Sequence, residues 1–234
     1  MNDSVIVSNT KDNVISDLAY DNVKIKSKKY VYRIIKRLFD IILSLIGLLF
    51  LIPVAMVIKI AYVLTGDFKS IFFTQKRIGK YGKEFRFYKF RSMIPNADEV
   101  LEKTLEMDKV LAEEYHVNKK LKNDPRITKI GKIIRKTSLD ELPQLINILL
   151  GQMSFVGNRP YLPREKEDMG NYFNDIVKTK PGLTGYWQVS GRSNTTFKER
   201  LKLESYYSNH AGLRIDTKIF FKTFAVVLLK KGAK

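Results

Sequence analysis

Eighteen consecutive residues carry no charge in Ile41-Ile-Leu-Ser-Leu-Ile-Gly-Leu-Leu-Phe-Leu-Ile-Pro-Val-Ala-Met-Val-Ile58, and Pro53 lies inside this run. Lys and Arg beside a membrane segment favour the cytoplasmic side, and here both flanks are basic. A helix that enters the bilayer, bends at Pro53 and returns keeps both flanks on that side. The flanking cations are Lys24, Lys26, Lys28, Lys29, Arg33, Lys36 and Arg37 upstream, and Lys59, Lys69, Lys76, Arg77, Lys80 and Lys83 downstream.

Two other structures fit the same apolar run. Eighteen residues lie at the short end of the length that spans a membrane, so a single crossing and a buried core helix of a soluble protein are the alternatives. Pro53 favours the bent, re-entrant helix, because proline removes a backbone donor and its ring clashes with the preceding turn. A secretory signal is excluded, since a long polar leader with acidic residues comes first.

Composition limits the classes of function. The 234 residues suit one domain, or one domain with a membrane element. Lys and Arg number 42 against 24 Asp and Glu, a net charge of +18. This charge indicates an anionic partner: a membrane surface, a nucleic acid or phosphorylated small molecules. The chain has no cysteine, which excludes disulfides, thiolate metal sites and cysteine nucleophiles. Its two histidines, His116 and His210, are too few for a histidine metal cluster.

The remaining pattern predicts an α+β chain that is mainly helical. Aromatic and polar residues alternate from Phe85 to Arg91, which with Ile71 to Gln75 predicts a β-hairpin. The helix expected over 217–231 is basic and amphipathic, so it either lies on the membrane or packs on the core. We expect a re-entrant membrane helix plus a small cytoplasmic catalytic domain with a short β-hairpin and surface amphipathic helices. The expected divisions are a flexible polar leader at 1–29, the membrane element at 30–64 and the cytoplasmic domain at 65–234.

Local signals predict the bounds of several segments. Asn96 and Glu99 match a capping box that opens a single charged helix reaching about Lys120. Residues 155–163 are expected to form a loop and residues 181–185 a turn, because both stretches contain Gly and Pro. Short helices are expected at 129–136, 144–150 and 197–208.

Adjacent carboxylates are the first candidates for chemistry. The chain has no G-x-x-x-x-G-K-[ST] loop, no G-x-G-x-x-G turn, no D-x-D pair and no G-x-S-x-G elbow. Asp140 and Glu141 follow Arg135 at an expected helix start. One interpretation is purely structural, with Ser138 and Glu141 forming a capping box. The other is catalytic: an ionised Asp140 beside a phosphoryl group is a plausible nucleophile, and Glu141 could hold Mg²⁺.

Arginines and polar residues in loops are the second set of candidates. Arg159, between Asn158 and Pro160, suits a bidentate clamp on phosphate, although an exposed loop arginine explains the same pattern. Trp187 lies among turn glycines and either cradles a nucleotide base or forms a structural corner. Further candidates for binding substrate or phosphate are Lys89, Arg91, Arg126, Gln188 and Arg192.

Taken in order, these motifs resemble the bacterial sugar transferases that act on polyprenyl phosphate, the monotopic phosphoglycosyl transferases. The resemblance covers about Tyr32 to Lys230. It rests on Lys36-Arg-Leu-Phe-Asp40, Phe73-Thr-Gln-Lys-Arg-Ile-Gly79, Tyr88-Lys-Phe-Arg-Ser-Met93, Arg135-Lys-Thr-Ser-Leu-Asp-Glu-Leu-Pro-Gln-Leu145, Gly151-Gln-Met-Ser-Phe-Val-Gly-Asn-Arg-Pro160 and Lys180-Pro-Gly-Leu-Thr-Gly185.

The resemblance implies a specific reaction and place. It implies transfer of a sugar-1-phosphate from a UDP-sugar to undecaprenyl (polyprenyl) phosphate with release of UMP, the first membrane step of exopolysaccharide, capsule or glycoconjugate assembly. By position, Asp140 becomes the nucleophile that forms a covalent phosphosugar, Glu141 the Mg²⁺ partner, and Arg135 and Arg159 phosphate ligands. It also implies a re-entrant helix at the cytoplasmic face of the cell (inner) membrane, and a catalytic core with a short leader.

Two positions depart from the family pattern. Asn158 replaces the first proline of the usual Pro-Arg-Pro loop, and Glu204 replaces the usual Asp before the tyrosine pair. Two other functions compete with the enzyme: a basic nucleic-acid-binding protein, favoured only by the charge, and a non-catalytic membrane scaffold in which the two acids only cap a helix. We expect no nucleic acid partner. The donor sugar and a homo-oligomer are left open.

Overall fold

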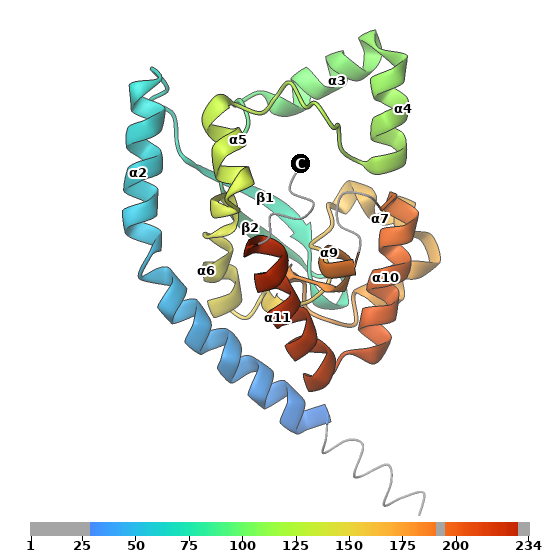
Figure 1. Ribbon diagram of the computed structural model, residues 1–234. Coiled ribbons are helices and arrows are strands. Elements are labelled where there is room, and N and C mark those ends of the chain that lie inside the picture. The colour runs from blue at the N-terminus through green and yellow to red at the C-terminus, as the bar shows by residue number, and fades with distance from the viewer. Residues whose placement is uncertain (1–28, 191–194, 229–234) are drawn as a thin grey trace, which may run out of the picture. The chain divides into compact units, whose positions relative to one another are not determined.

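The computed structural model describes residues 29–190 and 195–228. This part of the chain is mainly helical, with two small two-stranded sheets (Figure 1), which confirms the expected mainly helical class. The chain separates into two compact units, and the second begins at Asp40. The division into a membrane element and a cytoplasmic domain stays a prediction.

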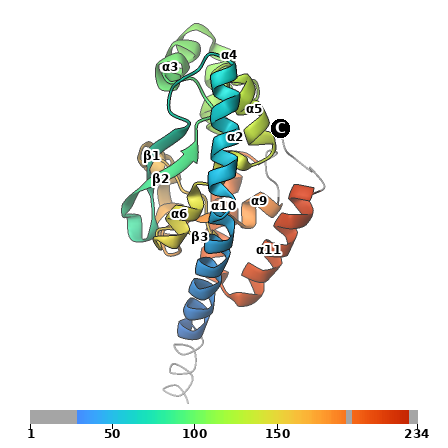
Figure 2. The ribbon, with the colours of Figure 1, turned by 90° about the vertical axis from the view of Figure 1, so that its left-hand side faces the viewer.

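The apolar run forms parts of two helices. Within the described residues, no single helix has both the length and the apolar composition of a membrane span. The helix Lys29–Leu48 and α2 (Leu51–Leu64) meet that requirement only as a pair, bent by 46° at their junction. The bend is visible in Figure 1, whereas in Figure 2 the two helices are seen almost in line. Pro53 lies in the first turn of α2. A proline ring opposes the carbonyl four residues earlier, so the helix breaks at residues 49–50, just before the expected bend at Pro53.

The predicted hairpin is confirmed. Strands β1 (Phe72–Ile78) and β2 (Glu84–Phe90) pair antiparallel, with the short helix η1 (Lys80–Gly82) at the turn. Alternation along β2 buries Phe85 and Phe87, which pack with residues of the helix that follows the acidic pair. The hairpin is therefore anchored on one face and carries polar residues on the other.

Three short elements follow one another beside the hairpin: α5 (Lys129–Lys136), η2 (Leu139–Glu141) and α6 (Gln144–Leu149). Ile134 of α5, Phe90 of β2 and Tyr62 of α2 belong to one buried apolar cluster. The Tyr62 hydroxyl also donates a hydrogen bond of 2.7 Å to the carbonyl of Arg91. These contacts fix η2, which carries the acidic pair, against β2.

The single helix expected from Asn96 to Lys120 is wrong. The chain forms α3 (Ala97–Met107) and α4 (Lys109–Asn118) instead. Asp108 separates them, because its carboxylate accepts hydrogen bonds from the backbone N–H groups of Val110 and Leu111 and caps α4. The side chain of Asn96 makes no capping hydrogen bond.

The loop and turn expected at 155–163 and 181–185 contain a parallel strand pair, β3 (Ser154–Val156) and β4 (Gly182–Thr184). These two segments are far apart in the chain, so the local sequence pattern of neither one indicates that they pair. The backbones approach closely at Gly157 and Gly182, where a Cβ on either residue would overlap backbone atoms of the other strand. Both positions therefore require glycine, because there is no room for a side chain.

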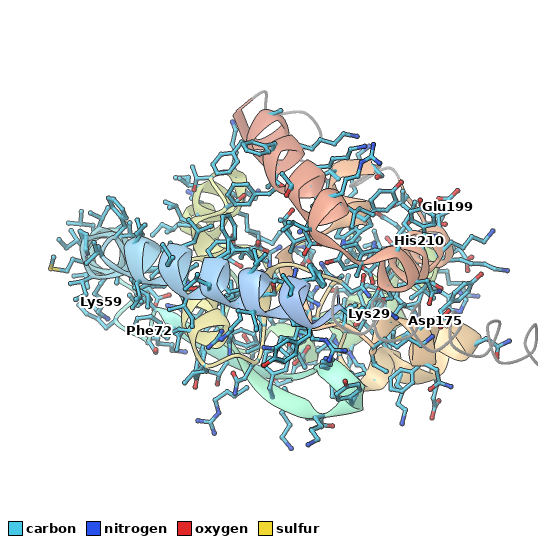
Figure 3. The ribbon with its side chains drawn as sticks, turned by 90° about the horizontal axis from the view of Figure 1, so that it is seen from below. Lys29, Lys59, Phe72, Asp175, Glu199 and His210 are labelled. Carbon is cyan, nitrogen blue, oxygen red and sulfur yellow. The ribbon has the colours of Figure 1, made fainter. Side chains whose placement is uncertain are left out.

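Short helices lead from β3 to the C-terminal part: η3 (Pro163–Glu165), α7 (Lys166–Met169), η4 (Gly170–Tyr172) and α8 (Phe173–Ile176). After β4 come α9 (Tyr186–Ser190), α10 (Phe197–His210) and α11 (Leu213–Leu228). The Asp175 carboxylate accepts hydrogen bonds from Ser205 and Asn209, and Figure 3 shows Asp175 near the end of α10 that carries His210.

The C-terminal helix α11 has a buried and an exposed side. Ile219 is buried with Val156 and Tyr207, whereas Phe221 and Phe224 are exposed. Of the two positions expected for this helix, packing on the core is confirmed, and its exposed side stays available to a membrane surface.

Replacing Gly157 by Ala should destabilise the fold. The added methyl group would meet the backbone of Lys180 and Gly182, and overpacking of this kind costs about 1–3 kcal/mol. We expect a lower free energy of unfolding, measured by denaturant titration in detergent. Gly212→Ala is the control, because its Cβ would meet only the carbonyl oxygen of His210 at 3.9 Å. Equal loss of stability in the two variants would contradict this account of the β3–β4 contact.

Candidate active site

The acidic pair lies in a single turn between two helices. Ser138 has φ of 58°, a left-handed conformation that ends α5, and η2 follows directly. The Ser138 side chain makes no capping hydrogen bond, so the capping-box interpretation of Ser138 and Glu141 is wrong. Asp140 is buried and Glu141 is partly exposed. Their position is therefore set by a strained turn rather than by a regular helix start.

A single ammonium group joins the two acids. Lys89 Nζ lies 3.1 Å from Asp140 Oδ2 and 3.3 Å from Glu141 Oε1. Lys89 comes from β2, and its ammonium also lies 5.7 Å from the ring centroid of Phe87. Two carboxylates from adjacent residues therefore face one cation, an arrangement in which carboxylate oxygens converge on a positive charge.

Arg135 also lies near the pair. Its Nε donates a hydrogen bond of 2.8 Å to Ser92 Oγ. Burial lowers the pKa of Arg135, and the negative charge of Asp140 opposes that shift. Arg135 and Lys89 are thus the predicted phosphate ligands that the structure brings to the dyad.

Other predicted ligands are engaged in structural contacts. Arg126 donates two hydrogen bonds to Asp124, at 2.8 and 2.6 Å; burial alone would lower the pKa of Arg126, but this ion pair raises it. Arg91 donates to Asp67 at 2.9 Å and to the carbonyl of Ser70 at 2.7 Å.

Two predicted ligands remain from the segment that ends at Arg192. Gln188 Nε2 donates to the Leu183 carbonyl at 3.2 Å. Arg192 lies outside the described residues. A role for either residue in binding substrate stays a prediction.

Arg159 lies in a loop that is clamped from both sides. Its backbone N–H donates to Glu204 Oε1 at 2.9 Å, and Arg77 Nη1 donates to the carbonyl of Pro160 at 3.0 Å. The Asn158 amide donates to Ser208 Oγ at 2.6 Å. Asn158 and Glu204, the two departures from the family pattern, therefore hold this loop through side-chain hydrogen bonds to and from α10.

Sequence reasoning missed Arg77 and Arg200 as parts of a site. Burial, followed by the charge of Arg159, lowers the pKa of Arg77 to about 10 and also lowers that of Arg200. Arg77 lies within one of the motifs that carried the resemblance, so the sequence contained a signal that could have identified it as a site residue. Arg200 lies on a charged helix with nothing to distinguish it from its neighbours.

The basic cluster approaches the acidic pair through Phe87. The guanidinium carbon of Arg77 lies 5.4 Å from the Phe87 ring centroid, and Lys89 Nζ lies 5.7 Å from the same point. One cation of each group therefore lies near the same aromatic ring.

The dyad fits a divalent cation only with help from other oxygen ligands. Among the described residues, no group of three or more His, Asp and Glu side chains is arranged to hold a metal. Mg²⁺ usually takes one or two carboxylates and completes its shell with water and substrate phosphates. The Lys89 ammonium, in contact with both acids, marks a place where a cation is stable.

Comparison with known proteins assigns the family. A family model described as bacterial sugar transferase matches residues 31–230. The chain is 40% identical over 198 residues to the exopolysaccharide production protein ExoY of Rhizobium meliloti, covering 85% of this chain and 87% of that one. The chain therefore belongs to the bacterial sugar transferase family, as the resemblance implied.

Longer relatives match over part of their length. The chain is 44% identical over 201 residues to the undecaprenyl-phosphate galactose phosphotransferase of Salmonella typhimurium, covering 86% of this chain and 42% of that one. It is 36% identical over 211 residues to the UDP-glucose:undecaprenyl-phosphate glucose-1-phosphate transferase of Escherichia coli, covering 87% and 42%. The chain spans less than half the length of these two relatives.

Glu204 should make stability depend on pH. Burial raises the pKa of this carboxyl from 4.5 to about 7, while the Arg159 N–H and nearby cations oppose the shift. The folded state thus binds the proton more tightly than the unfolded state, so stability is greatest below about pH 4.5 and falls as pH rises towards 7. Relative to Glu204→Gln, the native protein should lose up to about 3 kcal/mol between pH 5 and 8.

Denaturant unfolding at several pH values, in buffers without multivalent anions, measures this difference. Glu102→Gln on the exposed face of α3 is the control and should follow the native protein at every pH. A constant difference between the native protein and Glu204→Gln across this range would contradict the burial of an ionisable carboxyl at this position.

Proposed function

We propose that this protein transfers a sugar-1-phosphate from a UDP-sugar to polyprenyl phosphate at the cytoplasmic face of a membrane, releasing UMP. The observation that carries the proposal is the contact of Lys89 with both Asp140 and Glu141. It is a preformed place where a carboxylate nucleophile and a cation-binding carboxylate lie side by side. The family assignment and the activities after which the Salmonella and Escherichia relatives are named support the same reaction.

In the first step, an Asp140 carboxylate oxygen attacks the phosphorus that carries the sugar. The new O–P bond forms as the bond from that phosphorus to the bridging oxygen breaks, and UMP leaves with the electron pair. Asp140 has 8% of its side chain exposed, and Lys89 contacts its Oδ2 atom. We propose that the lysine side chain moves away from Asp140 as the donor binds, and that its ammonium then offsets negative charge on the phosphoryl oxygens.

In the second step, an oxygen of polyprenyl phosphate attacks the same phosphorus. The Asp140–phosphorus bond breaks, the carboxylate is restored, and the sugar is left on a lipid diphosphate. Splitting the reaction lets UMP depart before the second phosphate arrives, so two anionic substrates need not share the site at once. Arg135 beside the dyad offsets charge in both steps.

Mg²⁺ is the cofactor that the dyad fits best. Glu141 is the more exposed acid and would hold the ion together with substrate phosphate oxygens. When bound, Mg²⁺ neutralises charge on the transferring phosphoryl group. Asp140 is then left free to act as the nucleophile.

The membrane position rests on exposed apolar surface. Side chains along residues 42–64 leave a continuous apolar face uncovered, with Leu49 at 74% and Leu64 at 81% exposure. A patch of this kind on a basic protein indicates membrane contact. The bend between Lys29–Leu48 and α2 supports a re-entrant helix in the cytoplasmic leaflet. The exposed side chains are Ile42, Leu45, Ile46, Leu49, Phe50, Ile52, Met56, Val57, Ile60 and Leu64.

Replacing Asp140 by Asn should abolish transfer. Asparagine keeps the shape of the side chain but is a poor nucleophile, so UMP release should fall by roughly 10³-fold or more. The assay combines membranes, Mg²⁺, undecaprenyl phosphate and a panel of UDP-sugars, with UMP as the readout. Glu102→Gln on α3 should retain activity. Normal turnover by Asp140→Asn, with the protein still in the membrane fraction, would refute the proposed nucleophile.

Replacing Glu141 by Gln should weaken divalent-cation binding. Mn²⁺ serves as a paramagnetic probe for Mg²⁺, and free Mn²⁺ is measured by electron paramagnetic resonance in the presence of UMP. We expect affinity to fall by at least about tenfold, comparable to losses seen when groups that merely support a metal ligand are removed. Unchanged Mn²⁺ binding in Glu141→Gln would place the cation elsewhere.

A further inference from the structure

Two neighbouring arginines of this protein each have a buried Nε atom without a hydrogen-bond partner in the described part of the chain. Arg200 is 4% exposed and Arg159 is half-buried. Among the described residues, neither side chain donates a hydrogen bond or forms an ion pair, and the Nε atom of each is buried. Buried charges are nearly always paired, because removing an ion from water is costly. A bound anion would therefore satisfy these donors and offset their charge.

The indole of Trp187 supports both guanidinium groups. The guanidinium carbon of Arg200 lies 4.6 Å from the Trp187 ring centroid, and that of Arg159 lies 5.9 Å from it. Arginine stacks on aromatic faces and leaves its N–H edges free for planar acceptors. The Trp187 N–H is itself buried without a partner. The ring thus lies beside two arginines, and a role for it in holding a nucleotide base stays a prediction.

The surroundings add positive charge instead of removing it. Burial, and then the charges of Arg200 and Arg159, lowers the pKa of Lys120. Of the carboxylates nearby, Glu204 accepts the Arg159 backbone N–H through Oε1 and Glu165 accepts that of Leu162. Neither makes a hydrogen bond to a guanidinium group of the described residues. Besides burial, repulsion by the like charge of Arg159 therefore lowers the pKa of both Arg200 and Lys120.

We propose that Arg159, Arg200 and Trp187 form a second anion site, distinct from the Asp140–Glu141 dyad, which binds the dianion of a phosphate monoester. The guanidinium edges and the indole N–H supply donors in the number and geometry that phosphate oxygens accept. This choice of ligand rests on the proposed function, whose reaction involves two phosphate monoesters, UMP and polyprenyl phosphate. Arg77 lies near both sites, because the charge of Arg159 acts on it and it shares the Phe87 ring with Lys89.

Arg200→Gln tests the proposal, with Lys202→Gln as its matched control. Both substitutions remove one positive charge from α10, but Lys202 is exposed. Calorimetric titrations use UMP, farnesyl phosphate and inorganic phosphate against the detergent-solubilised full chain. We expect phosphate binding to weaken by roughly 10- to 100-fold in Arg200→Gln, the usual loss of a charged hydrogen-bonding partner, and to be unchanged in Lys202→Gln.

Thermal unfolding without phosphate separates this role from a structural one. Removing one of several repelling cations should leave the melting temperature of Arg200→Gln unchanged or raised, whereas loss of a structural arginine lowers it. Trp187→Phe provides a second variant, since it keeps the aromatic face and removes only the indole N–H. We expect it to fold normally and bind phosphate more weakly.

The three ligands identify the source of the phosphate. If Arg200→Gln loses only UMP binding, the site belongs to the nucleotide; if it loses only farnesyl phosphate binding, the site belongs to the lipid. If it loses binding of all three ligands, the site recognises the phosphate group alone. Each of these three results supports the site. Equal binding by the native protein, Arg200→Gln and Trp187→Phe, or no phosphate binding by the native protein, overturns it.

Parallel assays of UMP release keep the two proposals separate. A native protein that releases no UMP from any UDP-sugar, yet loses phosphate binding in Arg200→Gln, would contradict the proposed function and leave the anion site standing. A native protein that transfers sugar phosphate, but whose Arg200→Gln variant binds every phosphate normally, would support the proposed function and contradict the anion site.

Discussion

The shared contact of Lys89 with Asp140 and Glu141 is the constraint on which the site depends. It joins the β-hairpin to a single turn between α5 and α6, two parts of the chain about fifty residues apart. That turn begins with Ser138 in a left-handed conformation, which costs of order 1–3 kcal/mol and persists only where the surrounding packing holds it. The buried cluster of Tyr62, Phe90 and Ile134 supplies that packing. The apolar core thus sets the position of the carboxylates.

Charge is distributed around this contact in a way that suits phosphate chemistry. The dyad has its own lysine and Arg135, while a second set of cations gathers at the loop of Arg159, held by Glu204 and Arg77. The Phe87 ring lies near Lys89 of the first group and Arg77 of the second. Under the proposed function, this separation lets one phosphate react at the dyad while another is held apart. The uncovered apolar face of residues 42–64 would set both groups near lipid headgroups.

Local patterns in the sequence predicted the elements with strong periodicity or strong signals. The hairpin followed from alternation in Phe85–Arg91, and the helix at 129–136 has the expected bounds. Asp108 was not predicted as a helix cap, because it lies within a charged stretch whose pattern is typical of one continuous helix. The parallel pair β3–β4 joins segments that touch only in the folded chain. For the same reason the dyad could be proposed from sequence, whereas Arg200 could not, since its importance comes from Trp187 and Arg159 beside it.

The account stands most directly on the bond between Asp140 and phosphorus. Full-length protein is mixed with Mg²⁺ and each UDP-sugar in turn, without a lipid acceptor, quenched in acid and analysed by peptide mass spectrometry. The account predicts, for the true donor, a peptide containing Asp140 that is heavier by one sugar phosphate, formed in step with UMP. Release of UMP with an unmodified Asp140 peptide, or an adduct on another residue, would contradict it.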